Sequence, residues 1–297
     1  MNTVIYQFRA MGCPCELRLS IPEKLSEEQV IARCVAEAQR FEDKYSRYRP
    51  SSLVSRINVA AGIKAIDIDE ETSAIMDYAR VCFEQSNGLF DITAGSLRAL
   101  WHKDMKMLPN EEAIEQCLTK VGFDKLIVSK RGIFLPVAGM ELDFGGVVKE
   151  YAADAIAALA KSMGIQHGLV NLGGDVCVIG AQQGGAAWSI GVTNPFGYGE
   201  AIASIDLREG ALTTSGSYER FFEIEGKTYS HLINPLTGWP VEGLVSASVI
   251  AEQTVVAGSI SSIALLADAA GGLAWLQRCE APYLAVDQKR VCHGALQ

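Results

Sequence analysis

The sequence has no long apolar run, because no stretch reaches the ~20 apolar residues that a membrane helix requires. Clusters of basic residues are also missing: 26 Lys and Arg face 35 Asp and Glu, and the formal net charge is −9. Nucleic-acid binding depends on such clusters, so we expect no nucleic-acid partner and no membrane insertion. The first residues, MNTVIYQFRAM, show no basic segment followed by an apolar one, which predicts a cytoplasmic protein without a signal peptide.

Several common catalytic motifs are absent as well. There is no Gly-x-Ser-x-Gly elbow of a hydrolase, no P-loop and no Gly-x-Gly-x-x-Gly fingerprint. The four histidines and eight cysteines are not spaced as zinc ligands. Without an export signal, the cysteines are expected to be reduced thiols. Cys15 alternates with Leu17 and Leu19, so it is expected on the buried face of a strand, whereas Cys13 is left open as a pocket residue or a redox group.

The elements that remain indicate an α+β protein. Residues 3–20 are expected to be extended, with an interruption at Pro14, and a capping box at Ser26 and Gln29 predicts a helix over 26–46. Further helices are predicted over 70–86, 111–120, 147–163 and about 256–267, and strands fill much of the second half, with a hairpin turn at Glu225-Gly226. Because helices and strands come in blocks, and no linker is visible, we expect one α+β domain over 1–297.

Five short segments could carry chemistry. They are SRYRPSSLVSRIN around Tyr48, FDITAGSL with Thr93, Ala94 and Gly95, ELDFGGVVKEYAAD with Asp143 and Lys149, NLGGDV, and TTSGSYERFFEIEGKTYSHLINPLTGWP, which is expected to form a hydroxyl-rich turn and then a strand before His231. Lys149 lies in the first turn of a predicted helix, where N–H groups attract phosphate. His231 stands at a strand end beside a Pro/Gly loop and can move protons near neutral pH. Each segment also has a plain structural interpretation, as a solvated turn, a helix cap, a strand-to-helix turn, a hairpin or a structural histidine.

Taken in order, these segments resemble the ApbE-like FAD:protein FMN transferase family. MGC at residues 11–13, the segments above and LVNLGGDV are collinear with the family's motifs over about residues 8–265. The resemblance implies two closely associated lobes of largely antiparallel sheet with packed helices, and an FAD site between them. It implies that FMN is transferred from FAD to a threonine of a target flavoprotein, with release of AMP and the assistance of Mg2+.

By position, the resemblance implies site residues. It assigns FAD contacts to Met11, Tyr48, Thr93, Ala94, Gly95, Asp143, Lys149 and His231, with His231 also as the catalytic base, and it assigns Gly146 and Ser262 to the metal site.

One departure concerns the metal. AGSISS at residues 257–262 has Gly258 where the family has a ligating Asp, and Ser262 where it has a Thr. Hard dications prefer carboxylate oxygens, so metal binding is expected to weaken. Glu150, which stands where Gly is common, either disturbs the phosphate site or supplies the missing ligand; Asp143 and Ser262 are further candidates. The alternatives to transfer are an FAD carrier or sensor, an FAD pyrophosphatase giving FMN and AMP, and a structural protein with a decayed site.

Overall fold

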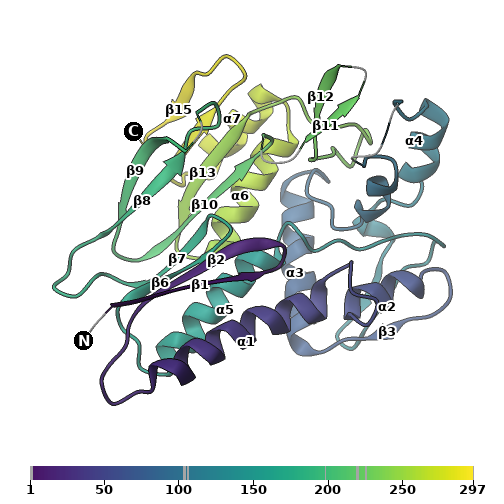
Figure 1. Cartoon of the computed structure of the whole chain (residues 1–297). Coiled ribbons are helices and arrows are strands. Elements are labelled where there is room, and N and C mark those ends of the chain that lie inside the picture. The colour runs from purple at the N-terminus through teal and green to yellow at the C-terminus, as the bar shows by residue number, and fades with distance from the viewer. Residues whose placement is uncertain are drawn as a thin grey trace.

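An antiparallel sheet runs through the protein (Figure 1). The computed structural model describes residues 3–102, 105, 107–197, 199–218, 221–224 and 226–296. Within these residues the sheet has eight strands in the order β1-β2-β6-β7-β10-β13-β14-β15, and every neighbouring pair is antiparallel. Their bounds are β1 Thr3–Ala10, β2 Cys13–Ser20, β6 Gly168–Leu172, β7 Asp175–Gly180, β10 Gly210–Gly216, β13 Ser246–Ala251, β14 Tyr283–Val286 and β15 Cys292–Gly294.

Three small sheets and a set of helices complete the described chain. The sheets pair β8 (Trp188–Thr193) with β9 (Ala201–Leu207), β11 (Phe221–Ile224) with β12 (Lys227–Ser230), and β5 (Gly132–Phe134) with both β3 (Ile66–Asp67) and β4 (Ile127–Ser129). The α-helices are α1 Glu27–Tyr45, α2 Leu53–Val59, α3 Glu70–Gln85, α4 Glu111–Leu118, α5 Val148–Ser162, α6 Thr254–Leu266 and α7 Ala269–Arg278. Two 3-10 helices, η1 (Gly95–Ala99) and η2 (Phe123–Lys125), are also present.

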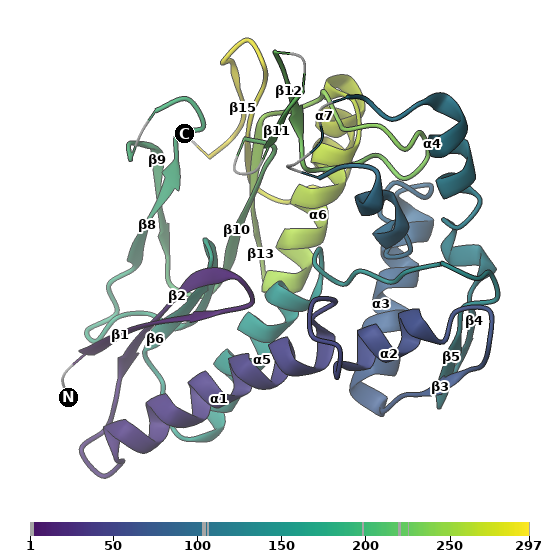
Figure 2. The ribbon, with the colours of Figure 1, turned by 45° about the vertical axis from the view of Figure 1, so that its right-hand side comes forward.

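The helices divide the molecule into two sides. Figure 2 shows α5 and α6 between the large sheet and a second group made of α2, α3, α4 and the sheet of β3, β4 and β5, while α1 runs below the large sheet toward α2. Along the chain, helices and strands come in blocks, and the strands of the large sheet pair antiparallel. The predicted α+β class is therefore confirmed.

The predicted helix starts follow from side-chain caps. Ser26 accepts a hydrogen bond from the backbone N–H of Gln29 at the start of α1, and Asp69 and Asn110 cap α3 and α4 in the same way. All five predicted helices begin and end within two residues of α1, α3, α4, α5 and α6, although no side chain caps α5 or α6. The fifth, expected at about 256–267, is α6, which begins two residues earlier at Thr254.

Two local expectations were wrong, and two helices were not expected. The break in residues 3–20 is the Met11-Gly12 turn, where both residues have positive φ, while Pro14 lies inside β2. The hydroxyl-rich stretch expected as a turn lies in β10, because residues 213–216 pair with β13, while residues 210–212 of the same strand pair with β7. Helices α2 and α7 were not predicted. The hairpin of β11 and β12 is confirmed by the pairing of Ile224 with Lys227, although Glu225 itself lies outside the described residues.

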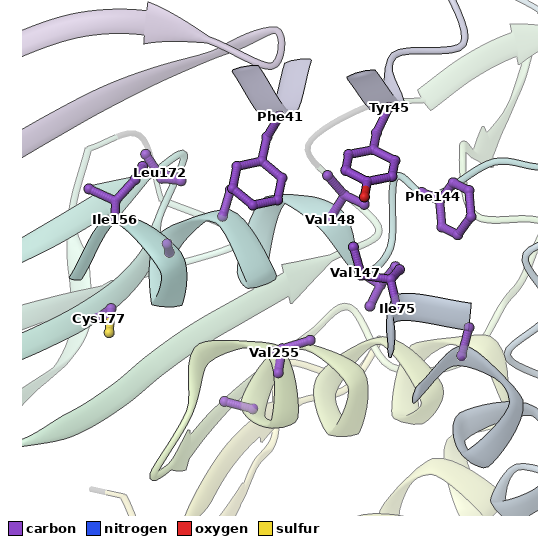
Figure 3. Close-up of a cluster of buried hydrophobic side chains, with 14 of the residues drawn as sticks. Phe41, Tyr45, Ile75, Phe144, Val147, Val148, Ile156, Leu172, Cys177 and Val255 are labelled. Atoms are coloured by element: carbon purple, nitrogen blue, oxygen red, sulfur yellow. The ribbon is translucent and has the colours of Figure 1, made fainter. Parts of the chain in front are cut away.

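The main core lies where three helices meet. Figure 3 shows Phe41 and Tyr45 of α1 above Val148 of α5, with Val255 of α6 on the far side. The ring of Phe144 lies 5.8 Å from that of Tyr45, at an angle of 68°. Because Phe144 comes just before α5, this packing fixes the segment that leads into that helix. Within the described part of the chain, no helix is both long and apolar enough to cross a membrane.

Candidate functional site

The start of α5 is the centre of the candidate site, and α6 packs along it in the opposite direction. The Asp154 carboxylate on α5 accepts hydrogen bonds from the backbone N–H groups of Thr254 and Val255, at 2.8 and 3.0 Å. One turn nearer the start of α5, Glu150 faces Gly258. The two contacts are separated by about four residues, or one turn, on each helix. One turn further, Ser262 of α6 is therefore expected beside Gly145 and Gly146, which precede α5. Predicted phosphate and metal residues from segments more than 100 positions apart in the sequence therefore meet at this point.

Lys149 is held between two carboxylates. Its ammonium group forms an ion pair with Asp175 and lies 3.3 Å from Oε1 of Glu150. Asp175 is only 2% exposed. Asp175 is placed by the tight β6–β7 hairpin, in which Gly173 and Gly174 both have positive φ. The hairpin interpretation of NLGGDV is confirmed, and the same hairpin delivers a carboxylate to Lys149. Asp175 was not among the predicted site residues.

Gly258 leaves room for Glu150. A Cβ atom added at position 258 would lie 2.5 Å from Cγ and 3.2 Å from Cδ of Glu150. The Glu150 residue is 6% exposed, and its Oε2 atom has no hydrogen-bond partner among the described residues. A buried carboxylate oxygen without a partner is costly, so this atom marks a position that favours a cation.

Hydroxyl groups gather at the next turn of α6, beyond Gly258. The Ser215 hydroxyl of β10 is 2.8 Å from the Ser261 hydroxyl and 3.2 Å from the Ser262 hydroxyl. Gly146, the other predicted metal residue, is covered by the ring of Phe90, which an added Cβ would approach to 3.3 Å. No group of three or more His, Cys, Asp or Glu side chains capable of holding a metal occurs in the described ranges. Any metal site here therefore depends on hydroxyl and backbone oxygens as well as carboxylate.

Asp143 is bound by two arginines. Its Oδ2 atom lies 2.6 Å from Nε of Arg98 and 3.3 Å from Nη1 of Arg47, and its Oδ1 accepts the Gly145 N–H at 2.9 Å. Arg47 also donates to the backbone oxygen of Gly95. A Cβ at Gly95 would lie 2.7 Å from the backbone oxygen of Glu141, so only glycine allows this approach. The arginine pair was missed because nothing around Arg47 or Arg98 in the sequence indicates that Asp143, 96 and 45 positions away, is the shared partner.

Thr93 supports the site from inside. The residue is fully buried, and its hydroxyl bonds to Oδ1 of Asp91 at 2.7 Å and accepts the Gly122 N–H at 2.7 Å. Burial raises the pKa of Asp91, although its hydrogen bonds act in the other direction. With no exposed surface, Thr93 can fix Ala94 and Gly95 in place but offers no atom to a ligand in this conformation.

The Met11-Gly12 turn lies on the other side of Lys149. Met11 has φ 51°, which non-glycine residues adopt rarely, and its N–H bonds to Oε2 of Glu42 at 3.0 Å. A Cβ at Gly173 would lie 2.8 Å from Cβ of Cys13 and 3.9 Å from Cδ of Lys149, so the turns are in close contact. Backbone strain of this kind is concentrated at functional sites.

The Cys13 and Cys15 thiols are both reduced, with 3.9 Å between their sulfur atoms. The hydrogen bond with Cys13 and burial raise the pKa of Cys15 well above its ordinary value. Cys15 is buried as predicted, and all eight cysteines lack disulfides.

Tyr48 is presented to solvent. It is 80% exposed, and the guanidinium carbon of Arg47 lies 5.9 Å from its ring centre. An exposed aromatic ring held beside an arginine can stack on a heterocycle.

His231 follows β12 directly and begins the Pro/Gly loop. That loop is tied to the segment after η1 by the Trp101 indole, which donates to the Gly238 oxygen at 2.8 Å. It is also tied to the last residue of α6, because the Asn234 side chain donates to the Leu266 oxygen at 3.4 Å. The loop therefore lies at the Ser262 end of α6.

Comparisons with known proteins agree on one family. A model of the ApbE family matches residues 11–285. The FAD:protein FMN transferase of Treponema pallidum (strain Nichols) is 30% identical, over 85% of this chain and 75% of that protein. That of Klebsiella pneumoniae (strain 342) is 29% identical, over 84% of this chain and 79% of that protein.

Solved structures show the same fold. The ApbE protein of Thermotoga maritima MSB8 superposes with a TM-score of 0.91 at 28% identity, covering 99% of this chain and 97% of that one. The flavin transferase ApbE from Vibrio cholerae has a TM-score of 0.87 at 20% identity, covering 99% of this chain and 96% of that one, and supports the fold alone. Since the family model spans nearly the whole sequence, the chain belongs to the ApbE family.

Proposed function

We propose that this protein is an FAD:protein FMN transferase. A threonine hydroxyl of a target flavoprotein attacks the FMN phosphorus of FAD, the P–O–P bond breaks, AMP leaves and the hydroxyl proton passes to a base. The observation that carries the proposal is the placement of Lys149 in the first turn of α5, against the Gly173–Asp175 hairpin and beside the Met11-Gly12 turn. The named relatives with this activity support it.

The start of α5 suits a pyrophosphate. Unlike α1, α3 and α4, this helix has no side chain capping its N-terminus. The N–H groups of Val147 and Val148 donate to the Phe144 oxygen, which leaves those of Lys149 and Glu150 available to an anion. Lys149 adds a positive charge there. Preorganised donors of this type stabilise the charge that develops as phosphate is transferred.

The remaining predicted contacts are distributed around this centre. Met11 and Tyr48 would flank the ring systems of FAD, whereas Ala94, Gly95 and Asp143 would contact it from the arginine-bound segment, with Thr93 behind them. His231 would act as the base that takes the hydroxyl proton. These roles stay predictions, as do the single domain over 1–297, the FAD site between two lobes and the cytoplasmic location.

Magnesium fits the oxygen donors at the α6 end of the site. The Ser262 hydroxyl and the Gly146 backbone carbonyl would hold it, and the buried Oε2 atom of Glu150 offers uncompensated negative charge nearby. When bound, the ion would neutralise charge on the pyrophosphate.

The test is transfer to a known acceptor flavoprotein with FAD and Mg2+, read as flavin fluorescence in a denaturing gel. A labelled band that is lost in His231→Ala supports the proposal. Chromatography of the mixture measures FMN and AMP. A dark acceptor with intact FAD indicates a carrier or sensor, and FMN with AMP but no label indicates a pyrophosphatase; either result overturns the proposal.

A further inference from the structure

We propose that Glu150 replaces the aspartate missing at position 258 as the carboxylate ligand of a divalent cation. The ligand would have moved from α6 to the facing turn of α5. This inference rests on the proposed function, because it concerns the metal of the same site, but it makes a separate claim about which helix supplies the charge.

Steric contact couples the two positions. Because an added Cβ at residue 258 would lie 2.5 Å from Cγ of Glu150, the glutamate side chain passes through the space that any side chain at 258 would enter. A carboxylate can therefore be supplied from position 150 or from position 258, but not from both without displacement. The glycine at 258 and the glutamate at 150 form one compensated pair.

The charges around Glu150 favour a further cation. Asp175 and Glu150 contribute two negative charges, and Lys149 supplies one positive charge. Lys149 lies against Oε1 of Glu150, while Oε2 is buried and without a hydrogen-bond partner in the described part of the chain. Burying an uncompensated carboxylate oxygen costs free energy, and a hard cation bound there would remove that cost.

The neighbouring donors are all oxygen atoms. At the next turn of α6, the Ser261 and Ser262 hydroxyls lie 2.8 and 3.2 Å from the Ser215 hydroxyl of β10. Oxygen-only sites select Mg2+, Mn2+ or Ca2+ over softer metals. Mn2+ is therefore a suitable probe for the site.

The experiment measures Mn2+ affinity of the full chain by titration calorimetry and by the electron paramagnetic resonance signal of free Mn2+. Both are run without flavin, and again with ADP as a pyrophosphate that cannot supply FMN. The variants are Glu150→Gln, which keeps the shape of the side chain, and the exchange Glu150→Gly with Gly258→Asp. Glu115→Gln, an exposed position on α4, is the matched control.

We expect Glu150→Gln to raise the Mn2+ dissociation constant at least tenfold, or about 1.4 kcal/mol. The exchange should recover most of the affinity, and Glu115→Gln should leave it unchanged. Equal affinity in wild type and Glu150→Gln overturns the proposal, and so does a wild type that binds no Mn2+ with or without ADP. Failure of FMN transfer alone leaves these affinities intact, so the two proposals are distinguished.

Discussion

The contact between Gly258 and Glu150 predicts a mutation whose effect changes sign with its background. Glycine inside an α-helix normally costs about 1 kcal/mol relative to alanine, so Gly258→Ala in α6 would ordinarily stabilise the protein. Here the new methyl group would lie 2.5 Å from Cγ of Glu150, which is itself buried. We therefore expect Gly258→Ala to destabilise the wild type.

The magnitude follows from the opposing terms. Overpacking a buried contact costs roughly 1–3 kcal/mol, and the helix gain offsets about 1 kcal/mol of it. In Glu150→Ala the Cγ and Cδ atoms are gone, and the nearest remaining Glu150 atom, Cβ, lies 3.4 Å from the new methyl group. The same Gly258→Ala change should then stabilise by up to about 1 kcal/mol, giving a coupling free energy of roughly 2 kcal/mol.

The assay is a double-mutant cycle from thermal unfolding of four proteins: wild type, both single variants and the double variant. A change of 1 kcal/mol corresponds to a shift of about 2 °C in Tm for a chain of this size. Gly258→Ala should lower Tm in the wild type and raise it in Glu150→Ala. A shift of the same sign in both backgrounds, or a coupling below about 0.5 kcal/mol, refutes the steric argument.

Three further changes test other parts of the site and fold. Tyr48→Ala should weaken FAD binding roughly 5- to 30-fold through lost stacking, and it should leave Tm unchanged because the residue is 80% exposed. Equal FAD affinity in wild type and Tyr48→Ala would exclude stacking of this ring on FAD. Asp143→Asn, which removes the charge that two arginines neutralise, should destabilise by about 2 kcal/mol and lower FAD affinity, as measured by urea unfolding and fluorescence titration. Burial raises the pKa of Glu71, but hydrogen bonds from Arg40 and two other donors outweigh it and lower the pKa to about 2. The ionised Glu71 carboxylate therefore stabilises the fold above about pH 4.5, and this stabilisation is lost as the pH falls toward 2. Glu71→Gln should lower the free energy of unfolding by roughly 1 kcal/mol at pH 7 and leave it unchanged near pH 2. A Tm difference from wild type that stays constant across this pH range contradicts the prediction.

Local rules explain what could be predicted about the fold. Caps at Ser26 and Asn110 satisfy N–H groups within the next turn, so their sequence neighbours are sufficient to place α1 and α4. The hydroxyl-rich end of β10, residues 213–216, was mistaken for a turn because hydroxyl residues favour turns locally, whereas pairing with β13 provides partners from elsewhere in the chain.

The sequence by itself determined the family, the α+β class and the order of the site segments, because these depend on local patterns and their spacing. Only the tertiary structure decided how the segments meet. The sequence showed Gly258 as a lost ligand and left the part of Glu150 open; packing of α5 against α6 brought these residues, more than 100 positions apart, into one space. Likewise the burial of Thr93 and the arginine contacts of Asp143 depend on long-range packing, which no local pattern encodes.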